Sequence, residues 1–430
     1  MTKKVFIDTA PACERRYLDA QRFYNYFIAN GQIIVDKPDK ADIIILITCG
    51  CMNWKSDCSF ELIKKYSKFS SKLIVAGCVP LIDEDRLSEI HKGITIVTKD
   101  LDKNPEKIDG VFPENKIKFN EIPDANLVFN ATKNSFIYTL LELLKKIKNF
   151  TVFYDKISSL YLKKIIGKNI LIYESSKKTK TALLRISWGC NSNCSYCAIK
   201  KSIGPHKSKS IEICIDEFKK GLNNGFKRFI IEADNPGLYG IDTGSSLPEL
   251  LDEITKIPGD YQILINNISP VYLLKYEKDL GMILGRKKII LILTPIQSGS
   301  ERILKLMQRY SNIEISKKNL MWIKKTFPHL ALFTHVIIGF PTETLQDFYQ
   351  SLNFIKDIKF DSVFFYAFSQ KKGTKSDSLE PKVAAEEIYK RLEYAKIYLK
   401  KEGYYQIPEN RRIYGKTNKD VLILVRKYPG

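Results

Sequence analysis

The sequence predicts an α/β protein, in which an N-terminal parallel α/β sheet domain is followed by a full or partial α/β barrel. Short runs of apolar, β-branched residues alternate with amphipathic helical patterns over residues 1–100 and again from Thr181 onward. The apolar runs show no polar alternation, which is typical of parallel strands that are covered on both faces. The length of 430 residues leaves room for two or three domains.

The N-terminal domain is predicted over residues 1–100. Its expected strands are "KVFID", "DIIILIT", "KLIVAG" and "GITIVT". Its expected helices are "ERRYLDAQRFYNYFIANG" and "WKSDCSFELIKKYSKF". Gly31 follows Asn30 where the first helical pattern stops, and such a glycine supplies the left-handed residue that closes many helices.

Residues 101–180 predict a linker or insert, because they are Lys-rich and are broken early by Pro and Asn. This segment contains one expected helix, "FIYTLLELLKKIKNF". The run "KKTKT" reads as an exposed connection, and it places a domain boundary near residue 180.

Residues 181–400 predict the barrel, with about six βα units. The expected strands are "ALLRISW", "RFIIEAD", "QILINN", "KIILILT", "LALFTHVIIG" and "SVFFYAFS". In such barrels the chemistry lies on the loops that follow the strands, and a loop with three cysteines follows the first of these strands. Residues 401–430 predict a basic C-terminal tail that ends in "KDVLILVRKYPG".

The composition indicates a cytoplasmic protein with a polyanionic partner. The formal charge is +21, from 69 Lys and Arg against 48 Asp and Glu, which favours RNA or an acidic peptide. A general bias toward Lys, Ile and Asn is the alternative source of this charge. No apolar run reaches about 18 residues, and the N-terminus lacks the pattern of a signal peptide, so no membrane contact is expected. In a reducing compartment the nine cysteines are better interpreted as metal ligands or catalytic groups than as disulfides.

The stretch "SWGCNSNCSYCAIKKSIG" carries Cys190, Cys194 and Cys197 in C-x3-C-x2-C spacing. Three thiols so close together do not suit a disulfide framework. Thiolates are the ligands of iron–sulfur clusters, and three of them leave one iron of a four-iron cluster without a protein ligand. Such an open metal position is a catalytic feature, because a substrate or cofactor can occupy it. A structural zinc site with a distant fourth ligand is the alternative.

This spacing resembles the radical S-adenosylmethionine (SAM) superfamily. The resemblance implies that the amino and carboxylate groups of SAM chelate the open iron, and that an electron from the cluster cleaves SAM to a 5′-deoxyadenosyl radical. The cofactor supplies the difficult chemistry, and the protein supplies geometry and excludes water.

A second cysteine set is predicted in the N-terminal domain. Cys49 and Cys78 directly follow expected strands, and Cys13 lies shortly after the first strand. Because the carboxyl ends of parallel strands meet at one edge of a sheet, these three cysteines can converge and again leave one iron open. Cys51 competes with Cys49 for one ligand position. The two remaining cysteines, Cys58 and Cys214, lie on expected helices and are interpreted as packing residues.

Two sets of three cysteines, one in each domain, resemble the radical-SAM methylthiotransferases. The same family's blocks are matched, in order and approximate spacing, by "GPHKSKSIEICIDEFKKGLNNGFKRFIIEADNPGLYGIDTGSSLPELLDEI", "TPIQSGSERILKLMQRYS", "VIIGFPTETLQDF" and "FSQKKGTKSDS". The resemblance runs from residue 4 to about residue 415 and is weakest in the linker. The segment "DNPGLYGIDTGSSLPELL" is most similar to the branch that modifies threonylcarbamoyladenosine in tRNA.

The resemblance implies a transferase with two [4Fe-4S] clusters, SAM and an external electron donor. The cluster on Cys190, Cys194 and Cys197 generates the radical. The cluster on the second set, Cys13, Cys49 and Cys78, presents a sulfur that is methylated by another SAM and transferred to an unactivated carbon. The two clusters must then face each other across that carbon, so the sheet edge is expected to pack over the open end of the barrel. A monomer is expected.

The resemblance also implies a set of SAM contacts on the loops at the barrel mouth. These positions are Tyr196, Glu232, Asp234, Asn267, Gln297, Ser298, Gly339 and Pro341. Ordinary turn chemistry or strand-end hydrogen bonding is the alternative explanation for each of them.

Two departures from the family bear on the substrate. His335 stands where the family often has an acidic residue, and Lys371, Lys372, Gly373 and Thr374 stand where it often has Arg-Pro-Gly-Thr. The run "GKTNKDVLILVRKYPG" is similar to the first strand of the TRAM domain, the small β-barrel that usually closes the family, so residues 401–430 are interpreted as a truncated remnant of it.

Without a TRAM domain, the leading hypothesis for the substrate is a ribosomally made precursor peptide. The alternative is a tRNA methylthiotransferase that acts on a threonylcarbamoyladenosine-type nucleoside, in keeping with the basic charge. A non-catalytic iron–sulfur protein that binds RNA is a third hypothesis.

Overall fold

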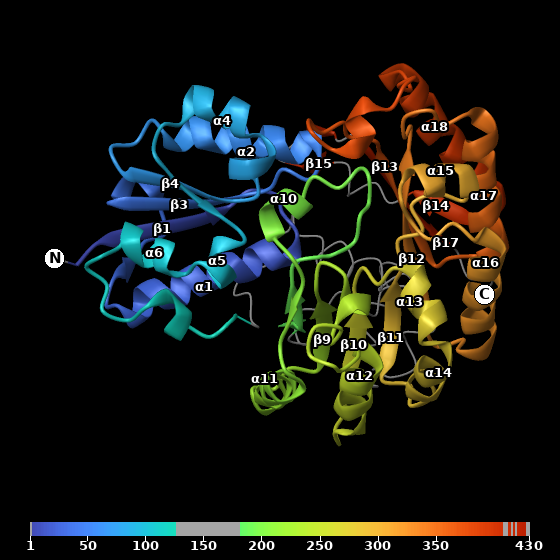
Figure 1. Cartoon of the computed structure of the whole chain (residues 1–430), viewed down its shortest axis with the longest axis horizontal. Helices are drawn as coiled ribbons and strands as arrows, with labels where there is room; N and C mark the ends of the chain where they lie inside the picture. Colours follow the sequence, from blue (N-terminus) through green and yellow to red (C-terminus); the bar gives the residue numbers. More distant parts are fainter. Residues whose placement is uncertain (1, 126–180, 407–411, 414–415, 418, 427–430) are drawn as a thin grey trace, which may run out of the picture.

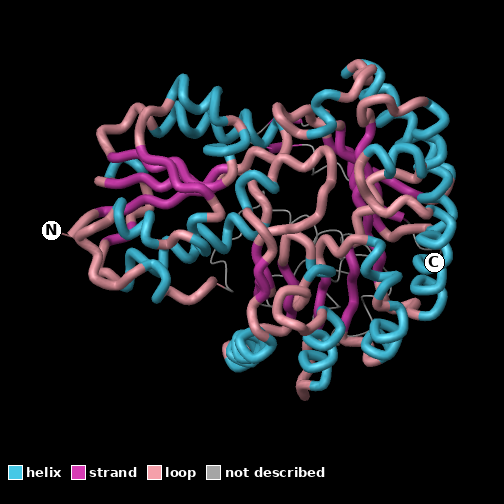
Figure 2. Tube along the Cα trace, in the orientation of Figure 1, coloured by secondary structure: helices cyan, strands magenta, loops and turns pink. Residues whose placement is uncertain are grey.

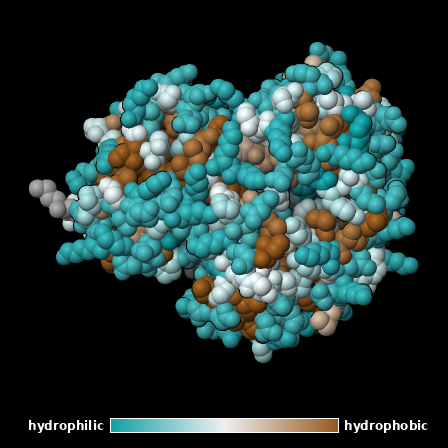
Figure 3. All heavy atoms as spheres, in the orientation of Figure 1, coloured by the Kyte–Doolittle hydropathy of each residue, from teal (hydrophilic) through white to brown (hydrophobic). Residues whose placement is uncertain are grey.

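The computed structural model describes residues 2–125, 181–406, 412–413, 416–417 and 419–426, and it places an N-terminal α/β domain against a barrel domain (Figure 1). The expected helix in "FIYTLLELLKKIKNF" and the "KKTKT" connection lie outside these residues, apart from the last threonine. On the face shown in Figure 3 most of the surface is hydrophilic, with apolar residues in separate patches. No helix in the described part of the chain is long and apolar enough to cross a membrane.

The N-terminal domain is a five-stranded parallel sheet in the order β2-β1-β3-β4-β5. Figure 2 shows its strands in magenta, with helices in cyan on either side. All four expected strands are present, and the sheet adds a short edge strand. The strands are β1 (Lys4–Thr9), β2 (Ile33–Ile34), β3 (Ile43–Thr48), β4 (Lys72–Gly77) and β5 (Ile94–Val97). Every residue of the central β3 is buried, because helices cover both faces of the sheet.

The helices of this domain lie on the two faces of the sheet. They are α1 (Glu14–Ala29), η1 (Pro38–Lys40), α2 (Asn53–Tyr66), α3 (Val79–Ile82), α4 (Glu84–Ile90), α5 (Asp100–Lys103), α6 (Glu106–Val111) and η2 (Phe119–Glu121). The first long helix ends as expected, since Asn30 caps it and Gly31 takes a φ of 71°.

The start of the expected linker differs from the prediction. Residues 101–122 fold onto the N-terminal sheet, where Leu101, Ile108, Phe112 and Phe119 are buried in the same cluster as Val5. The many lysines of this segment predicted an exposed linker, but an apolar side chain at each turn is buried against the sheet. The guanidinium of Arg22 on α1 fixes this segment by donating hydrogen bonds to three of its backbone carbonyls.

The barrel domain contains six parallel strands in the order β13-β12-β11-β10-β9-β6, which confirms the expected α/β barrel in its partial, open form. The strands are β6 (Thr181–Arg185), β9 (Arg228–Glu232), β10 (Gln262–Ile265), β11 (Ile289–Leu293), β12 (Ala331–Ile338) and β13 (Ser362–Ala367). A separate two-stranded sheet, β7 (Ser187–Trp188) and β8 (Lys207–Ser208), flanks the cysteine loop.

Helices cover the outer face of this curved sheet (Figure 1). They are α10 (Lys200–Ile203), α11 (Ile211–Asn223), η4 (Pro236–Leu238), α12 (Leu247–Lys256), α13 (Pro270–Lys275), α14 (Glu277–Gly285), α15 (Glu301–Leu306), α16 (Ile313–Thr326), α17 (Leu345–Ile358), η5 (Lys375–Ser378) and α18 (Ala385–Lys401). The inner face has its own apolar cluster, to which Leu18 of the N-terminal helix α1 contributes. The two domains therefore share a core.

The C-terminal segment also differs from its expected role as a tail or a remnant of a separate domain. Strand β17 (Val421–Arg426) pairs antiparallel with β13, and β14 (Tyr404–Gln406) pairs with β17, so both extend the barrel sheet. The strand β17 is buried because its apolar residues face the barrel core on both sides. A further two-stranded pair is formed by β15 (Arg412–Ile413) and β16 (Lys416–Thr417).

Candidate active site between the two domains

The N-terminal cysteines gather at the carboxyl edge of the five-stranded sheet. Cys13 precedes α1, Cys49 follows β3, and Cys78 follows β4. The parallel register pairs Thr9 with Ile47 and Thr48 with Gly77, so the three strands end at the same level. Together with Cys51, the three cysteines line one cavity of about 160 Å³. Cys214 is buried in the barrel core as expected, whereas Cys58, on α2, is only half-buried.

Two arginines that follow Cys13 surround this cavity. Arg16 donates to Cys78 Sγ at 3.8 Å and forms an ion pair with Asp19 at 3.0 Å. Burial raises the pKa of the Cys13 thiol, and burial also raises the pKa of Cys78 to about 12. A cation close to these sulfurs favours the thiolate form that metal binding requires.

Cys49 and Cys51 are in direct contact, with their sulfur atoms 3.4 Å apart. The hydrogen bond between these two sulfurs lowers the pKa of Cys49. Cys49 is buried at the end of β3, and its backbone N–H donates to Ser59 Oγ at 3.1 Å. Both sulfurs line the cavity.

The barrel cysteines lie in the loop between β7 and α10. Ser192 N donates to Cys190 Sγ at 3.4 Å, and Arg309 Nη1 donates to Cys194 Sγ at 3.5 Å. Burial, together with the charges of the neighbouring Cys194 and Cys190, raises the pKa of Cys197 to about 11. The three thiols therefore affect one another's ionisation, and hydrogen-bond donors point at the sulfurs of Cys190 and Cys194.

The structure brings the two cysteine sets to the same interface. Ser202, at the end of the cysteine loop, donates through Oγ to the carbonyl of Cys78 at 3.0 Å. Cys78 also packs with Ala198, which directly follows Cys197. The cavity beside the N-terminal cysteines is closed on the barrel side by Asp234, Asn267, His335 and Tyr366, so the sheet edge packs over the barrel mouth as expected.

A buried cation joins the two domains at this interface. Arg15 of α1 forms ion pairs with Glu232 at 3.2 Å and with Asp234 at 3.0 Å, and it donates to the carbonyl of Ala233 at 3.1 Å. Burial raises the pKa of Glu232 to about 8, and Arg15 opposes this shift. Arg15 therefore holds the end of β9 beneath the N-terminal cysteines.

Comparison with known proteins decides what this arrangement is. The model of the radical SAM superfamily matches residues 184–355, and that of the uncharacterized protein family UPF0004 matches residues 4–99. The chain is 27% identical over 372 residues to a probable threonylcarbamoyladenosine tRNA methylthiotransferase of Pyrococcus horikoshii, covering 86% of this chain and 78% of the relative. It is 26% identical to a tRNA-2-methylthio-N(6)-dimethylallyladenosine synthase of Thermodesulfovibrio yellowstonii, covering 98% and 88% of the two chains.

A third relative is the ribosomal protein uS12 methylthiotransferase RimO of Clostridium kluyveri, which is 28% identical over 383 residues and covers 87% and 77% of the two chains. The chain belongs to the radical-SAM methylthiotransferase family. Among solved structures, the radical S-adenosylmethionine methyltransferase TsrM of Kitasatospora setae has a TM-score of 0.58 at 10% identity and covers 99% and 84% of the two chains, which shows a shared fold.

This radical-SAM methylthiotransferase is accordingly a transferase whose cofactors are SAM and [4Fe-4S] clusters. The thiols in both sites fit such clusters, because each site offers three cysteines with donors near the sulfurs, and cysteine thiolates are the usual ligands. In the described residues no group of three Cys, His, Asp or Glu side chains is arranged for a single metal ion. The thiolates of a four-iron cluster bind separate irons and need not converge on one point.

Four of the SAM positions expected in this radical-SAM methylthiotransferase lie around the two cysteine sites. Tyr196 lies beside Arg309, whose Nη1 is 3.5 Å from the phenol oxygen. Glu232 and Asp234 are held by Arg15, and the amide of Asn266 donates to Glu232 at 2.6 Å. Asn267 lines the cavity with a φ of 64°.

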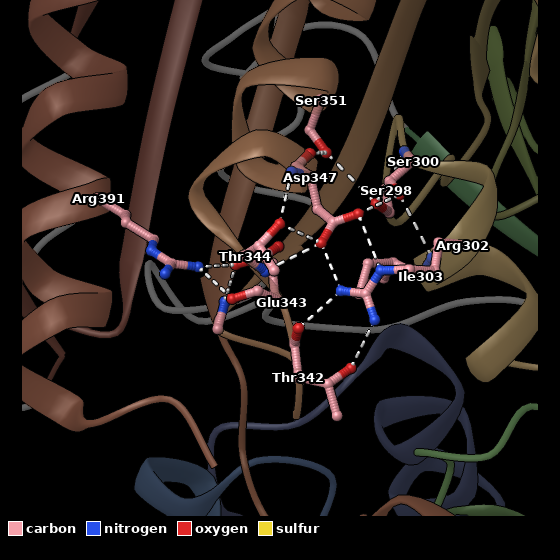
Figure 4. A network of polar contacts seen from close by, with 11 residues as sticks. Ser298, Ser300, Arg302, Ile303, Thr342, Glu343, Thr344, Asp347, Ser351 and Arg391 are labelled. Atoms are coloured by element: carbon pink, nitrogen blue, oxygen red, sulfur yellow. Dashed lines mark hydrogen bonds and ion pairs between the residues drawn. The ribbon is translucent and has the colours of Figure 1, made fainter. Parts of the chain in front are cut away.

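The other four positions serve the barrel framework. Gln297 extends β11 beside β12 by exchanging backbone hydrogen bonds with His335 and Ile337. Ser298 is fully buried, and its hydroxyl lies 3.3 Å from that of Ser351 on α17, so the structure does not bring this side chain to the mouth (Figure 4). Its strand-end position had suggested the opposite orientation.

The loop with Gly339 and Pro341 is fixed by the polar network of Figure 4. Glu343 accepts from Gly339 N at 2.7 Å and forms an ion pair with Arg391 of α18 at 2.8 Å. A Cβ on Gly339 would lie 2.2 Å from Ile388, so this glycine is required for the close approach of α18. Pro341 is buried in the same loop.

Sequence reasoning missed the charged residues that organise this site. These are Arg15, Arg16, Lys55 and Arg309. The pair "RR" directly after Cys13 was a usable signal, because charged residues at the start of a helix beside an expected metal ligand must lie close to it. Two residues that differ from those usual in the family lie at this interface. His335 lines the cavity, and Lys371 donates to Ser56 and forms an ion pair with Asp83 of the N-terminal domain.

Proposed function

We propose that this enzyme is a tRNA methylthiotransferase that modifies a threonylcarbamoyladenosine-type nucleoside. The observation that carries the proposal is the cavity between the domains, which is reached by the cysteines of one domain and by the strand-end side chains of the other. A target carbon placed there would lie beside the N-terminal cysteines, and Ile199 and Ile203, which follow the barrel cysteines in the chain, line the same cavity. The net charge of +21 supports a nucleic-acid substrate.

In this proposal Cys190, Cys194 and Cys197 hold the cluster that binds SAM, and Cys13, Cys49 and Cys78 hold the second cluster. When bound, these groups supply the carbon-centred radical and the methylthio group. The chain itself supplies position: Arg15 fixes Glu232 and Asp234, which face the expected amino group or ribose of SAM. The packed domain interface limits the entry of water, which would otherwise compete for a reactive site.

The tRNA hypothesis is favoured over a precursor peptide because the relatives described above are named for tRNA or ribosomal protein substrates.

The test is mass spectrometry of nucleosides after anaerobic incubation of the reconstituted enzyme with SAM, a reductant and tRNA that bears threonylcarbamoyladenosine. The expected result is a methylthio adduct on that nucleoside. Parallel incubations with ribosomal protein uS12 and with tRNA that bears dimethylallyladenosine define the alternatives. An adduct on uS12 alone would show that the substrate is a protein.

A further inference from the structure

Lys55 is a cation in the cavity beside the N-terminal cysteines, at the interface with the barrel. It lies in the first turn of α2, is half-buried, and lines the cavity together with Cys51, His335 and Tyr366. Its ammonium group lies 5.3 Å from the ring of Trp54. The lysine therefore extends from the N-terminal domain toward the carboxyl ends of β12 and β13.

The other cations around the cavity have carboxylate partners of their own. Arg15 is paired with Glu232 and Asp234, and Arg16 is paired with Asp19. Lys55, in contrast, forms no ion pair with a carboxylate within the described residues. Its charged neighbours in the cavity are instead the thiols of Cys51, Cys49 and Cys13, so no carboxylate of the described chain occupies the ammonium, and a ligand can bring one.

The candidate nucleosides differ in the charge of their substituents. A threonylcarbamoyl group ends in a carboxylate, whereas a dimethylallyl group is an uncharged hydrocarbon. A carboxylate beside the ammonium gains a charge-assisted hydrogen bond, while a hydrocarbon in the same place would leave the cation unpaired. The charge in the cavity thus distinguishes the two tRNA substrates for which relatives of this chain are named.

We propose that Lys55 is a specificity-determining residue that binds the carboxylate of the threonylcarbamoyl substituent. The inference rests on the proposed function, because it places the modified nucleoside of tRNA in this cavity. Its Nζ donates to the carboxylate, and the ring of Trp54 supports the lysine from its own helix. Lys55 does not itself react.

The experiment compares the reconstituted wild-type enzyme with Lys55→Met and Lys55→Arg in binding to three tRNAs and in methylthiolation of them. The first bears threonylcarbamoyladenosine, the second is the same tRNA with unmodified adenosine at that position, and the third bears dimethylallyladenosine. The wild type should prefer the first. Lys55→Met should reduce this preference about 10-fold to 100-fold, the range for a hydrogen bond to a charged group, and Lys55→Arg should retain most of it. Lys64→Met is the matched control, because it removes an exposed charge from the same helix.

Several results would overturn the inference. One is an unchanged preference in Lys55→Met, and another is a loss of iron from this variant, which would mean that the lysine serves the cysteine site. Tighter binding of tRNA with dimethylallyladenosine would also contradict it while leaving a tRNA substrate in place. If the wild type methylthiolates neither tRNA, the proposed function fails and the inference fails with it. If the wild type methylthiolates the threonylcarbamoyl substrate but Lys55→Met keeps the same binding preference, the proposed function stands and only the role of Lys55 is refuted.

Discussion

The two cysteine sites reach a similar composition by different routes. In the barrel, Cys190, Cys194 and Cys197 lie in one loop, so local spacing alone sets their positions. In the N-terminal domain, Cys13, Cys49 and Cys78 are separated by long segments and meet only because parallel strands end at one edge. The barrel site therefore depends on a local sequence motif, whereas the N-terminal site depends on the arrangement of the parallel sheet. The first should tolerate changes in the fold that would dismantle the second.

The largest expected effect separates the roles of the two sites. Cys194→Ala should abolish the formation of 5′-deoxyadenosine from SAM, because it removes a ligand from the barrel loop. Cys78→Ala should retain this cleavage and lose methylthio transfer. Chromatography of anaerobic reaction mixtures measures both products. Cleavage of SAM by Cys194→Ala would remove the distinction between the sites.

The next effect concerns the ambiguous pair in the N-terminal site. Cys49→Ala should lose about four of about eight irons, and Cys51→Ala should keep them. Cys49 is buried at the end of β3, with its backbone anchored by Ser59, whereas Cys51 lies half-buried in the loop beyond. Iron analysis after reconstitution makes the comparison. The reverse pattern would assign Cys51 as the ligand.

A smaller effect tests how the two sites are held together. Arg15→Met should lower the free energy of unfolding by about 3 kcal/mol, because it leaves the carboxylates of Glu232 and Asp234 buried without their cation. Lys40→Met, which breaks the exposed pair with Asp36, should change it by less than about 1 kcal/mol. Urea unfolding of both variants provides the measurement. Equal effects would mean that Arg15 adds no more than a surface ion pair.

The smallest effect is the pH dependence on the barrel side of the cavity. Burial lowers the pKa of His335 to about 3, well below its ordinary value, so the folded protein holds this ring neutral. The unfolded chain binds a proton first, so stability should fall by up to about 1.4 kcal/mol per pH unit as the pH drops below about 6.5. His335→Gln should flatten this slope in urea unfolding between pH 5 and pH 7. An unchanged slope in His335→Gln would assign the pH dependence to other groups.

The sequence allowed the prediction of features that depend on local pattern. The apolar runs predicted the parallel strands, and the spacing around Cys194 predicted the barrel loop. The convergence of Cys49 and Cys78 was also predictable, because it follows from a general property of parallel sheets.

Features that depend on distant partners could not be predicted in this way. Arg15 and Glu232 are 217 positions apart, and no local pattern encodes their contact. Strand β17 was recognised as a strand, but its pairing with β13 is decided by tertiary packing. The end of β11 similarly left open whether the hydroxyl of Ser298 points to the mouth or to α17.

The most direct test of two separate cysteine sites is the iron content of two triple variants. One replaces Cys13, Cys49 and Cys78 by Ala, and the other replaces Cys190, Cys194 and Cys197 by Ala. Anaerobic reconstitution followed by iron analysis and Mössbauer spectroscopy should give about eight irons in the wild type and about four in each triple variant, all in [4Fe-4S] form. A triple variant that keeps all of the iron, or that binds none while remaining folded, would contradict the account.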